Sequence, residues 1–150
     1  MPRARGFTLI ELLVVLALLA LATASVSLAM RSSDRDQLER EAERLGTLLD
    51  AARVEARTQS VAVRWRVVAN DAQGAQFRFE GLPSRMALPT RWLGPEAPSV
   101  TLEPAATAVV LGPEPLIPAQ TLRLRLHDAE LRLGTDGLGP FALQRDAPAP

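Results

Sequence analysis

The chain has no cysteine, no lysine and a single histidine among its 150 residues. The lack of cysteine excludes a catalytic thiol, a cysteine-ligated zinc site and any disulfide bond. It does not exclude an oxidising compartment, since proteins of such compartments can lack disulfides. The one histidine, His127, cannot form a His-rich metal cluster, and we expect it at a turn or a strand end. Arginine takes the place of lysine throughout the chain, and we attribute this to genomic base composition.

The sequence also lacks the short motifs that carry catalysis. It contains no G-x-S-x-G, H-E-x-x-H, P-loop or G-x-G-x-x-G pattern. Three acids near predicted turns, Asp128, Glu130 and Asp136, do not follow the calcium-loop pattern. We therefore predict that the protein is not an enzyme, with no catalytic residue, no cofactor and no metal site.

Net charge and hydrophobic content narrow the kinds of protein that this chain can be. The net charge is zero, so the chain as a whole does not attract nucleic acid or acidic lipid. Hydrophobic residues make up 47% of the chain, with the densest run near the N-terminus. The length suits one domain of ordinary size plus an extension.

The N-terminal region begins with a short basic segment, residues 1–6, followed by an apolar stretch at 7–30. A helix needs roughly 20 apolar residues to cross the hydrocarbon core of a bilayer, so this stretch is long enough. Arg3 and Arg5 place the N-terminus in the cytoplasm by the positive-inside rule. We therefore predict a single membrane crossing.

Two simpler segments share this composition. One is a secretory signal cleaved after the A-T-A sequence at 22–24, and the other is an uncleaved signal anchor. Glu11 argues against both, because a charged side chain inside a span costs up to roughly 2.5–3.5 kcal/mol and neither segment gains from it. An acid in the membrane calls for a partner, and a cation is the simplest one.

The residues from Gly6 to Leu12, G-F-T-L-I-E-L, resemble the processing site of type IV pilins and type II secretion pseudopilins. The resemblance implies that prepilin peptidase cleaves between Gly6 and Phe7 and that the new N-terminus of Phe7 is methylated. Glycine has no side chain to obstruct the protease. Glu11 can then pair with the new amine of its own or a neighbouring subunit, which avoids the cost of a buried charge without a partner.

Beyond the predicted span, apolar residues recur in alternating steps of four and three, which indicates that the helix continues. We expect it to run from about Phe7 to about Thr58 and to pack on the chain's own β domain in its second half. Charge pairs at Asp36–Arg40 and Glu41–Arg44 support its exposed faces. The apolar stripe consists of Leu38, Ala42, Leu45, Leu49, Ala52 and Ala56.

From residue 61 the pattern changes to the period of two that is typical of β-strands. In the first strand we expect Val61, Val63, Trp65 and Val67 on the buried face. The region 81–118 is rich in proline and glycine, so we expect mainly irregular surface loops there. The predicted strands lie at 61–67, 76–80, 100–102, 108–111, 121–127, 129–133 and 141–143.

Within the pilin-like proteins, the layout resembles the GspH/FimT family, which joins the H-type minor pseudopilin of type II secretion to a minor pilin of type IV pili. The matching elements are the N-terminal motif, the helix end that runs into the first strand, and the late hairpin that ends in G-T-D-G at 134–137. The resemblance implies an α+β fold in which a long N-terminal transmembrane and assembly helix packs on a small antiparallel β-sandwich. The implied parts are a leader at 1–6, a transmembrane half-helix at 7–30, a periplasmic half-helix at 31–59 and a periplasmic β domain at 60–150.

The resemblance implies a structural role. The chain would be a minor pseudopilin of the type II secretion system, at or near the tip of the periplasmic pseudopilus that promotes export of folded proteins across the outer membrane. Its partners would be other minor and major pseudopilins, prepilin peptidase and the inner-membrane assembly platform. It would cross the bacterial inner membrane once, with its N-terminus in the cytoplasm and its C-terminal domain in the periplasm. The alternative is a FimT-like minor type IV pilin in pilus assembly or DNA binding and uptake.

Outward positions of two predicted hairpins carry arginine, which raises the hypothesis of a basic surface for DNA. The zero net charge and the nearby acids favour a solvated sheet face instead, so nucleic acid is not an expected partner. The arginines concerned are Arg64, Arg66, Arg78, Arg123, Arg125 and Arg132.

Overall fold

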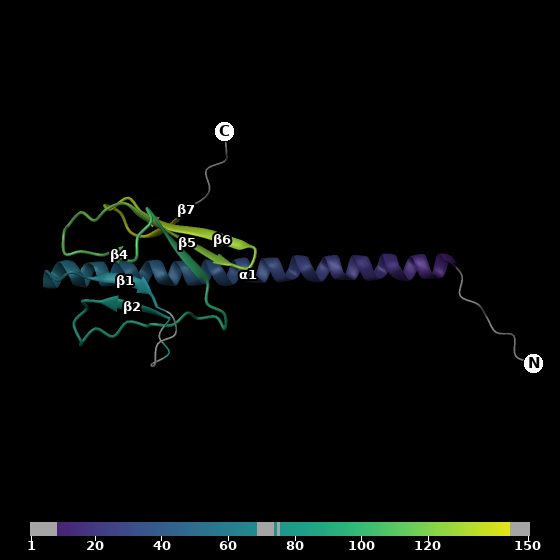
Figure 1. Cartoon of the computed structure of the whole chain (residues 1–150), viewed down its shortest axis with the longest axis horizontal. Coiled ribbons are helices and arrows are strands. Elements are labelled where there is room, and N and C mark those ends of the chain that lie inside the picture. Colours follow the sequence, from purple (N-terminus) through teal and green to yellow (C-terminus); the bar gives the residue numbers. More distant parts are fainter. Residues whose placement is uncertain (1–8, 69–73, 75, 145–150) are drawn as a thin grey trace, which may run out of the picture. The chain divides into compact units, whose positions relative to one another are not determined.

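The computed structural model describes residues 9–68, 74 and 76–144, without the side chains of residues 24–32 (Figure 1). The chain divides into two compact units, Met1–Ser33 and Asp34–Pro150. The predicted leader at 1–6, Phe7 and most of the predicted turn after the first strand lie outside the described residues, as does the C-terminal tail from residue 145.

One helix, α1 (Leu9–Gln59), belongs to both units. The helix is followed by Ser60, whose φ of 54° lies in the left-handed region and turns the chain away from the helix axis. The amide of Val61 then donates to the carbonyl of Ala56 at 3.0 Å. The structure thus confirms that the helix continues well past residue 30 and ends close to residue 58.

In the first unit, the described side chains of α1 are exposed on every face, and all of them except Glu11, Thr23 and Ser33 are apolar. Among the large hydrophobic side chains of this part, the exposed fraction ranges from 77% at Leu9 to 42% at Val15. Among the residues whose placement is described, no helix is both long enough and apolar enough to cross a membrane.

In the second unit, α1 buries one stripe. All six residues of the predicted stripe, from Leu38 to Ala56, are no more than 1% exposed, which confirms that this half packs on the chain's own β domain. The alternating steps of three and four keep these side chains on one face of the helix.

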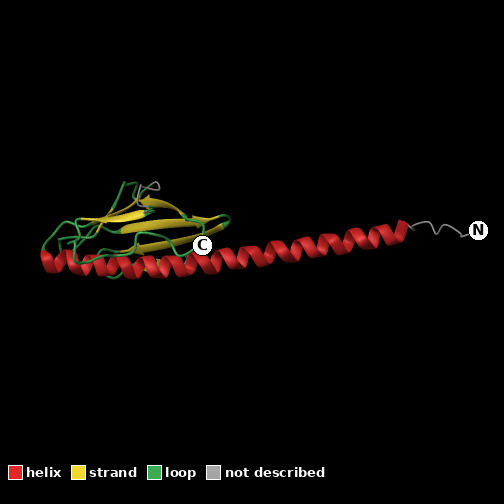
Figure 2. Cartoon of the chain, turned by 90° about the horizontal axis from the view of Figure 1, so that it is seen from below, coloured by secondary structure: helices red, strands yellow, loops and turns green. Residues whose placement is uncertain are grey.

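The rest of the second unit is antiparallel β structure, seen in yellow against the helix in Figure 2. A three-stranded sheet has the order β2-β1-β4, and a four-stranded sheet has the order β3-β5-β6-β7. The chain therefore has an α+β fold with a helix packed on antiparallel sheets. The strands are β1 (Arg64–Val67), β2 (Phe77–Glu80), β3 (Ser99–Glu103), β4 (Val109–Val110), β5 (Gln120–Leu126), β6 (Ala129–Thr135) and β7 (Ala142–Gln144).

The first strand differs from its prediction in two ways. It begins at Arg64 rather than at residue 61, and Val67 is 45% exposed. Val67 lies on the wall of a cleft of about 240 Å³ that also includes Val100 and Leu102, so the period of two does not place it in the core.

The Pro- and Gly-rich region contributes more to the core than expected. Trp92, in a loop, is 6% exposed and packs on Phe77 with ring centroids 4.8 Å apart. Its ring also meets Trp65 edge-on at 6.5 Å. Ile117, in another loop of this region, is 4% exposed. The expectation of surface loops is therefore wrong at Trp92 and Ile117, whose side chains lie in the core.

Candidate functional site

The predicted processing site lies largely outside the described residues, since these begin at Leu9. Glu11 lies in the first turn of α1, and its side chain is exposed. A carboxylate there interacts favourably with the positive end of the helix dipole. The side chains around Glu11, Ile10 and Leu12 among them, are large, apolar and more than half exposed.

An apolar surface of this extent is unusual for a soluble monomer and marks a site for another protein or a membrane. The backbone of such a helix can also leave water at little cost, because the amides and carbonyls of an α-helix form hydrogen bonds with one another. The described side chains of residues 9–23 therefore form an apolar surface with one carboxylate, that of Glu11, near its start.

In the second unit, α1 holds the loops of the β domain with buried charged side chains. Glu41 is 1% exposed, and its Oε1 accepts hydrogen bonds from the amides of Leu93 and Gly94, the latter at 2.8 Å. The guanidinium of Arg44 lies 3.8 Å from the other carboxylate oxygen of Glu41. The loop that these bonds hold presents Leu93 to solvent, at 63% exposure.

A second contact of this kind holds the turn between β6 and β7. Arg53 is 5% exposed and donates hydrogen bonds to the carbonyls of Gly137 and Gly139, the latter at 2.7 Å. One turn earlier, Asp50 accepts a hydrogen bond from the amide of Phe141 at 3.1 Å. Burial raises the pKa of the Asp50 carboxyl, and it lowers the pKa of the Arg53 guanidinium.

The same turn is also held from within. The carboxylate of Asp136 accepts hydrogen bonds from the amides of Gly139 at 2.7 Å and Leu138 at 2.9 Å. These two bonds lower the pKa of Asp136, because they stabilise its charged form.

Sequence reasoning missed these loop contacts. The charges of Glu41 and Arg53 resemble those of any exposed helix face. The only available signal was their position directly beside a residue of the apolar stripe, which brings each of them to the edge of the buried face.

His127 occupies the turn between β5 and β6, as predicted, with a φ of 51°. It also joins two acids that the sequence did not connect with it. Its Nδ1 lies 3.1 Å from a carboxylate oxygen of Asp34 on α1, and its Nε2 lies 3.2 Å from one of Glu96. Within the described part of the chain, no group of three histidine or acidic side chains is arranged to hold a metal ion.

The six candidate arginines fall into two groups on different sheets. In the three-stranded sheet, Arg64 and Arg66 are exposed on β1, and Arg78 lies opposite Arg66 on β2. The Nε of Arg66 lies 2.5 Å from a carboxylate oxygen of Glu80, which balances part of the charge.

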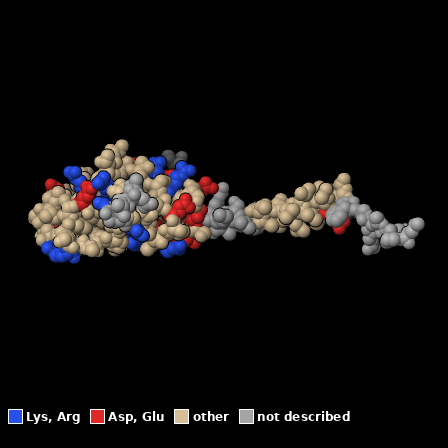
Figure 3. Space-filling model, turned by 60° about the horizontal axis from the view of Figure 1, so that its bottom comes forward, with Lys and Arg blue, Asp and Glu red and all other residues tan. Residues whose placement is uncertain are grey.

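In the four-stranded sheet, Arg123 and Arg125 lie on β5, and Arg132 lies opposite Arg123 on β6. Arg123 forms ion pairs with Glu103 and Glu130, the latter at 3.4 Å. Figure 3 shows basic and acidic side chains mixed on the visible face of the domain. The six arginines thus do not form one continuous basic surface.

Comparison with known proteins identifies the N-terminal segment. Residues 1–27 match the family described as "Prokaryotic N-terminal methylation motif". No curated protein and no solved structure matches the chain. The matched segment contains Gly6, Phe7 and Glu11, and it supports a type IV pilin-like protein with a membrane-anchored N-terminus. Such a motif implies processing by prepilin peptidase and pilus-like assembly with other pilins.

Proposed function

We propose that this protein is a minor pseudopilin of the type II secretion system, a structural subunit at or near the tip of the periplasmic pseudopilus. The observation that carries the proposal is the methylation motif at 1–27, followed in one chain by an exposed apolar helix and a β domain folded on the continuation of that helix. In this role the β domain contacts other pseudopilins, and the filament promotes export of folded proteins across the outer membrane.

The proposed chemistry of assembly lies at the N-terminus. Cleavage after Gly6 creates a cationic amine on Phe7, and Glu11 supplies the carboxylate that pairs with such an amine when both leave water. The pair reduces the cost of burying either charge alone. The apolar stretch 7–30 crosses the inner membrane once, with the N-terminus in the cytoplasm and the β domain in the periplasm.

The role we assign is structural, without catalysis. Energy for export comes from a separate cytoplasmic ATPase, and this chain contributes its contacts within the filament. Its GspH/FimT-like character is part of the same proposal and rests on the order of helix, first strand and late hairpin.

Deletion of the gene in its own host tests the proposal. We expect folded exoproteins to accumulate in the periplasm of the deletion strain and to be released again when the gene is restored. Normal release without the gene would overturn the secretion role. Restoring the gene with Glu11→Ala shows whether export needs assembly of the chain into the filament or only its presence in the membrane.

The Glu11→Ala variant is expected to enter the membrane and to lose its leader, but not to join filaments, because the buried amine then has no carboxylate. Leader loss is measured by gel mobility, and incorporation by co-purification with sheared filaments. Glu11→Asp, which keeps the charge, is the matched control and should retain part of the incorporation. Normal incorporation of Glu11→Ala would refute the pairing.

The alternative function is a FimT-like minor type IV pilin that binds DNA during uptake. The observation that favours it is the pair of exposed arginines on β1, Arg64 and Arg66: Glu80 lies opposite Arg64 in the sheet but forms its ion pair with Arg66, and Arg64 forms none with the described side chains. Salt-dependent binding of short duplex DNA, weakened by Arg64→Ala with Arg66→Ala, would support it. Absence of binding at low salt would exclude it.

A further inference from the structure

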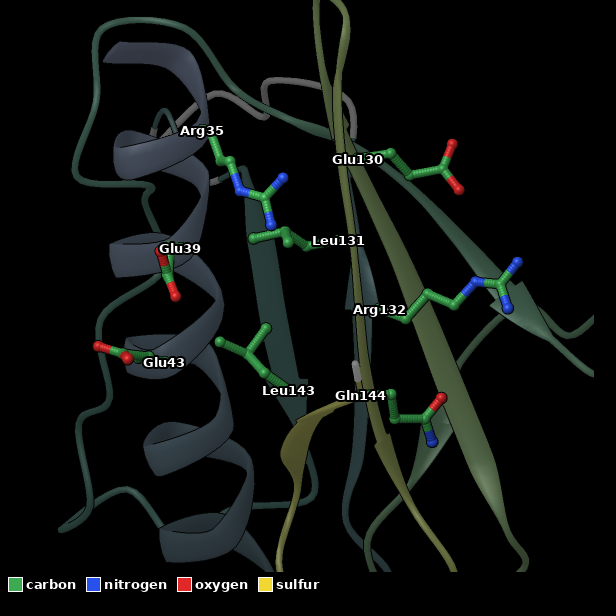
Figure 4. Close-up of a pocket in the computed structure, with 8 residues that line it drawn as sticks. All are labelled: Arg35, Glu39, Glu43, Glu130, Leu131, Arg132, Leu143 and Gln144. Atoms are coloured by element: carbon green, nitrogen blue, oxygen red, sulfur yellow. The ribbon is translucent and has the colours of Figure 1, made fainter. Parts of the chain in front are cut away.

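Two clefts of the second unit differ in what they can bind. The larger, about 700 Å³, lies between α1 and the strands β6 and β7 (Figure 4). Leu131 and Leu143 point from these strands toward α1, whereas Arg132 and Gln144 on the same strands point away from the helix. The Glu43 carboxylate points away from both leucines. The polar side chains of this groove do not converge, so it specifies no ligand.

The smaller cleft, about 240 Å³, lies where the two sheets leave strand edges open. In the three-stranded sheet, β2 pairs with all of β1 on one side, but β4 pairs only with Arg64 and Trp65 on the other. In the four-stranded sheet, β3 pairs with β5 and is an outer strand. Within the part of the chain that the structure describes, one edge of Arg66 and Val67 and the outer edge of β3 thus have no strand beside them.

Both open edges border this cleft. Arg66 and Val67 line it from β1, and consecutive residues of β3, 100–102, line it from the other sheet. Successive side chains of a strand point to opposite faces, so a cleft lined by consecutive residues meets the strand at its edge rather than on one face. The amides and carbonyls of an open edge are the groups that bind an added strand.

The edge of β3 fits a short extended segment. Pro98 and Pro104 flank this strand, and proline has no amide hydrogen with which to extend a ladder. An added strand can therefore pair over the five residues of β3. The cleft is smaller than the roughly 300–1,000 Å³ of small-molecule sites, so it suits individual side chains of a peptide rather than a compact ligand.

The side chains of the cleft determine the chemistry of such a segment. Val67 is 45% exposed, and Val100 and Leu102 are partly buried, so the domain leaves apolar surface uncovered there. Trp65 also lines the cleft, and its Nε1 is buried without a hydrogen-bond partner among the described residues. A segment with apolar side chains at alternate positions covers this surface, since alternate residues of an added strand face the same side.

The charge around the cleft is positive. Arg66 is the one charged residue among the described residues that line it. Arg64 and Arg78 lie on the same sheet face, the first two positions away on β1 and the second opposite Arg66 on β2. Glu80 is the acid of this set, and its ion pair with Arg66 is about half exposed on both sides, so exchange for another carboxylate costs little. Charge complementarity therefore favours an acidic residue on the added segment.

We propose that this cleft receives an extended, acidic segment of a different pilin-like subunit, which adds as a strand to the outer edge of β3. The proposal rests on the filament role proposed above and assigns the surface through which this chain holds a neighbour. Because the partner is not a second copy, the contact does not propagate along a filament, which suits a minor subunit. Anchoring both subunits in one membrane raises their effective concentration for the contact.

Photo-cross-linking of the full chain in host membranes tests the contact. Thr101 is exposed on β3 and lines the cleft, and the variant Thr101→p-benzoylphenylalanine places a photoreactive group there. We expect a light-dependent adduct with another pilin-like subunit. Mass spectrometry should locate the linked residue in a segment that has apolar residues at alternate positions and carries an acid.

A second photoreactive position distinguishes a bound strand from a bound helix. Ser99 lies two residues before Thr101 and is also exposed. With Ser99→p-benzoylphenylalanine, an added strand should shift the linked position on the partner by about two residues. A bound helix would shift it by about four, because two strand residues span about 6.6 Å and a helix rises about 1.5 Å per residue. The helical shift would overturn the proposal.

A pair of matched valine variants tests whether the cleft itself forms the contact. Val67→Glu should lower the yield of adduct by about tenfold or more, because it places a second negative charge against an acidic segment in an apolar cleft. Val54→Glu is the control, since Val54 is 63% exposed on α1 and does not line the cleft. It should leave the yield unchanged, and equal losses from the two variants would overturn the proposal.

The identity of the linked chain decides the remaining outcomes. No adduct in membranes where the chain is processed, or an adduct within this chain or to a second copy of it, would overturn the proposal. An adduct to an exported protein would overturn it too, by assigning the cleft to cargo. If deletion blocks exoprotein release but no adduct forms, the secretion role stands and the strand contact fails. If release is normal and the expected adduct forms, the contact stands in another pilus and the secretion role fails.

Discussion

The two halves of α1 use apolar residues in opposite ways. In the first unit, large side chains such as Leu9 and Leu16 are 77% and 54% exposed, and the apolar residues surround the helix. In the second unit, the apolar residues form one stripe, and Leu38 and Leu49 are fully buried at 0% exposure. The difference lies in how the apolar residues are distributed around the helix. A helix that is apolar on every face needs other molecules to remove its side chains from water, whereas a helix with one apolar stripe can bury that stripe against a single sheet.

Charged residues follow the same division. In the first unit, Glu11 lies exposed at the start of the apolar surface. In the second unit, Glu41 and Arg53 are buried and hold loops of the β domain. One half of the helix thus presents its side chains to other molecules, and the other half uses them to stabilise its own fold.

Truncation of one leucine in each half should give the largest contrast. Leu49→Ala is expected to lower the free energy of unfolding by about 2–5 kcal/mol, because it leaves a cavity in the core. Leu16→Ala should change it by less than about 0.5 kcal/mol, because Leu16 touches no core. Urea unfolding of the full chain in detergent, followed by tryptophan fluorescence, measures both, since Trp65 and Trp92 are buried in the second unit. Similar losses in the two variants would break the comparison.

The sequence predicted what depends on periodicity. The stripe from Leu38 to Ala56 repeats every three to four residues, and the strands of the late hairpin alternate every two residues, with the turn at His127 between them. The structure confirms all three. The N-terminal motif is recognisable for a similar reason, because it consists of consecutive residues, and the match of residues 1–27 to a methylation motif supports a type IV pilin-like protein.

Contacts between distant segments were not predictable in this way. Trp92 reaches the core from an irregular loop, and His127 meets Asp34 and Glu96 through the fold alone. The same holds for the bonds of Arg53 to the turn after β6, which join residues more than 80 positions apart. No local pattern encodes such pairs, since their geometry arises only when the sheets pack on α1.

Arg53 offers a sharper test of the second half. Arg53→Met is expected to cost about 2–3 kcal/mol of unfolding free energy, because the carbonyls of Gly137 and Gly139 lose a charged donor. Arg57→Met is the matched control: Arg57 is exposed and, among the described residues, its side chain donates to the carbonyl of Pro115 alone, so the loss should stay below about 1 kcal/mol. The same urea titrations compare the two. Equal losses would show that burial of the guanidinium does not matter.

The pH dependence of stability gives the smallest effect, with opposite signs at two acids of this region. The pKa of Asp136 is lowered from its ordinary 3.8 by its backbone hydrogen bonds, so the unfolded chain binds that proton more tightly. Its contribution is complete above about pH 4 and is lost as the pH falls through the folded pKa. Asp136→Ala should therefore lower the melting temperature at pH 7, with a difference from the wild type that shrinks toward pH 2.

Asp50 should behave in the reverse sense, because burial raises its pKa above 3.8 in the folded state. There the native state binds the proton more tightly, so the carboxyl costs stability as the pH rises from about 4 through the folded pKa. Asp50→Asn keeps an acceptor for the amide of Phe141 but cannot ionise. Its melting temperature relative to the wild type should therefore rise across that interval, whereas that of Asp136→Ala falls at lower pH, between about pH 2 and pH 4, and stays level above it. Parallel curves for the two variants would show that net charge, rather than burial against α1, determines the acid response.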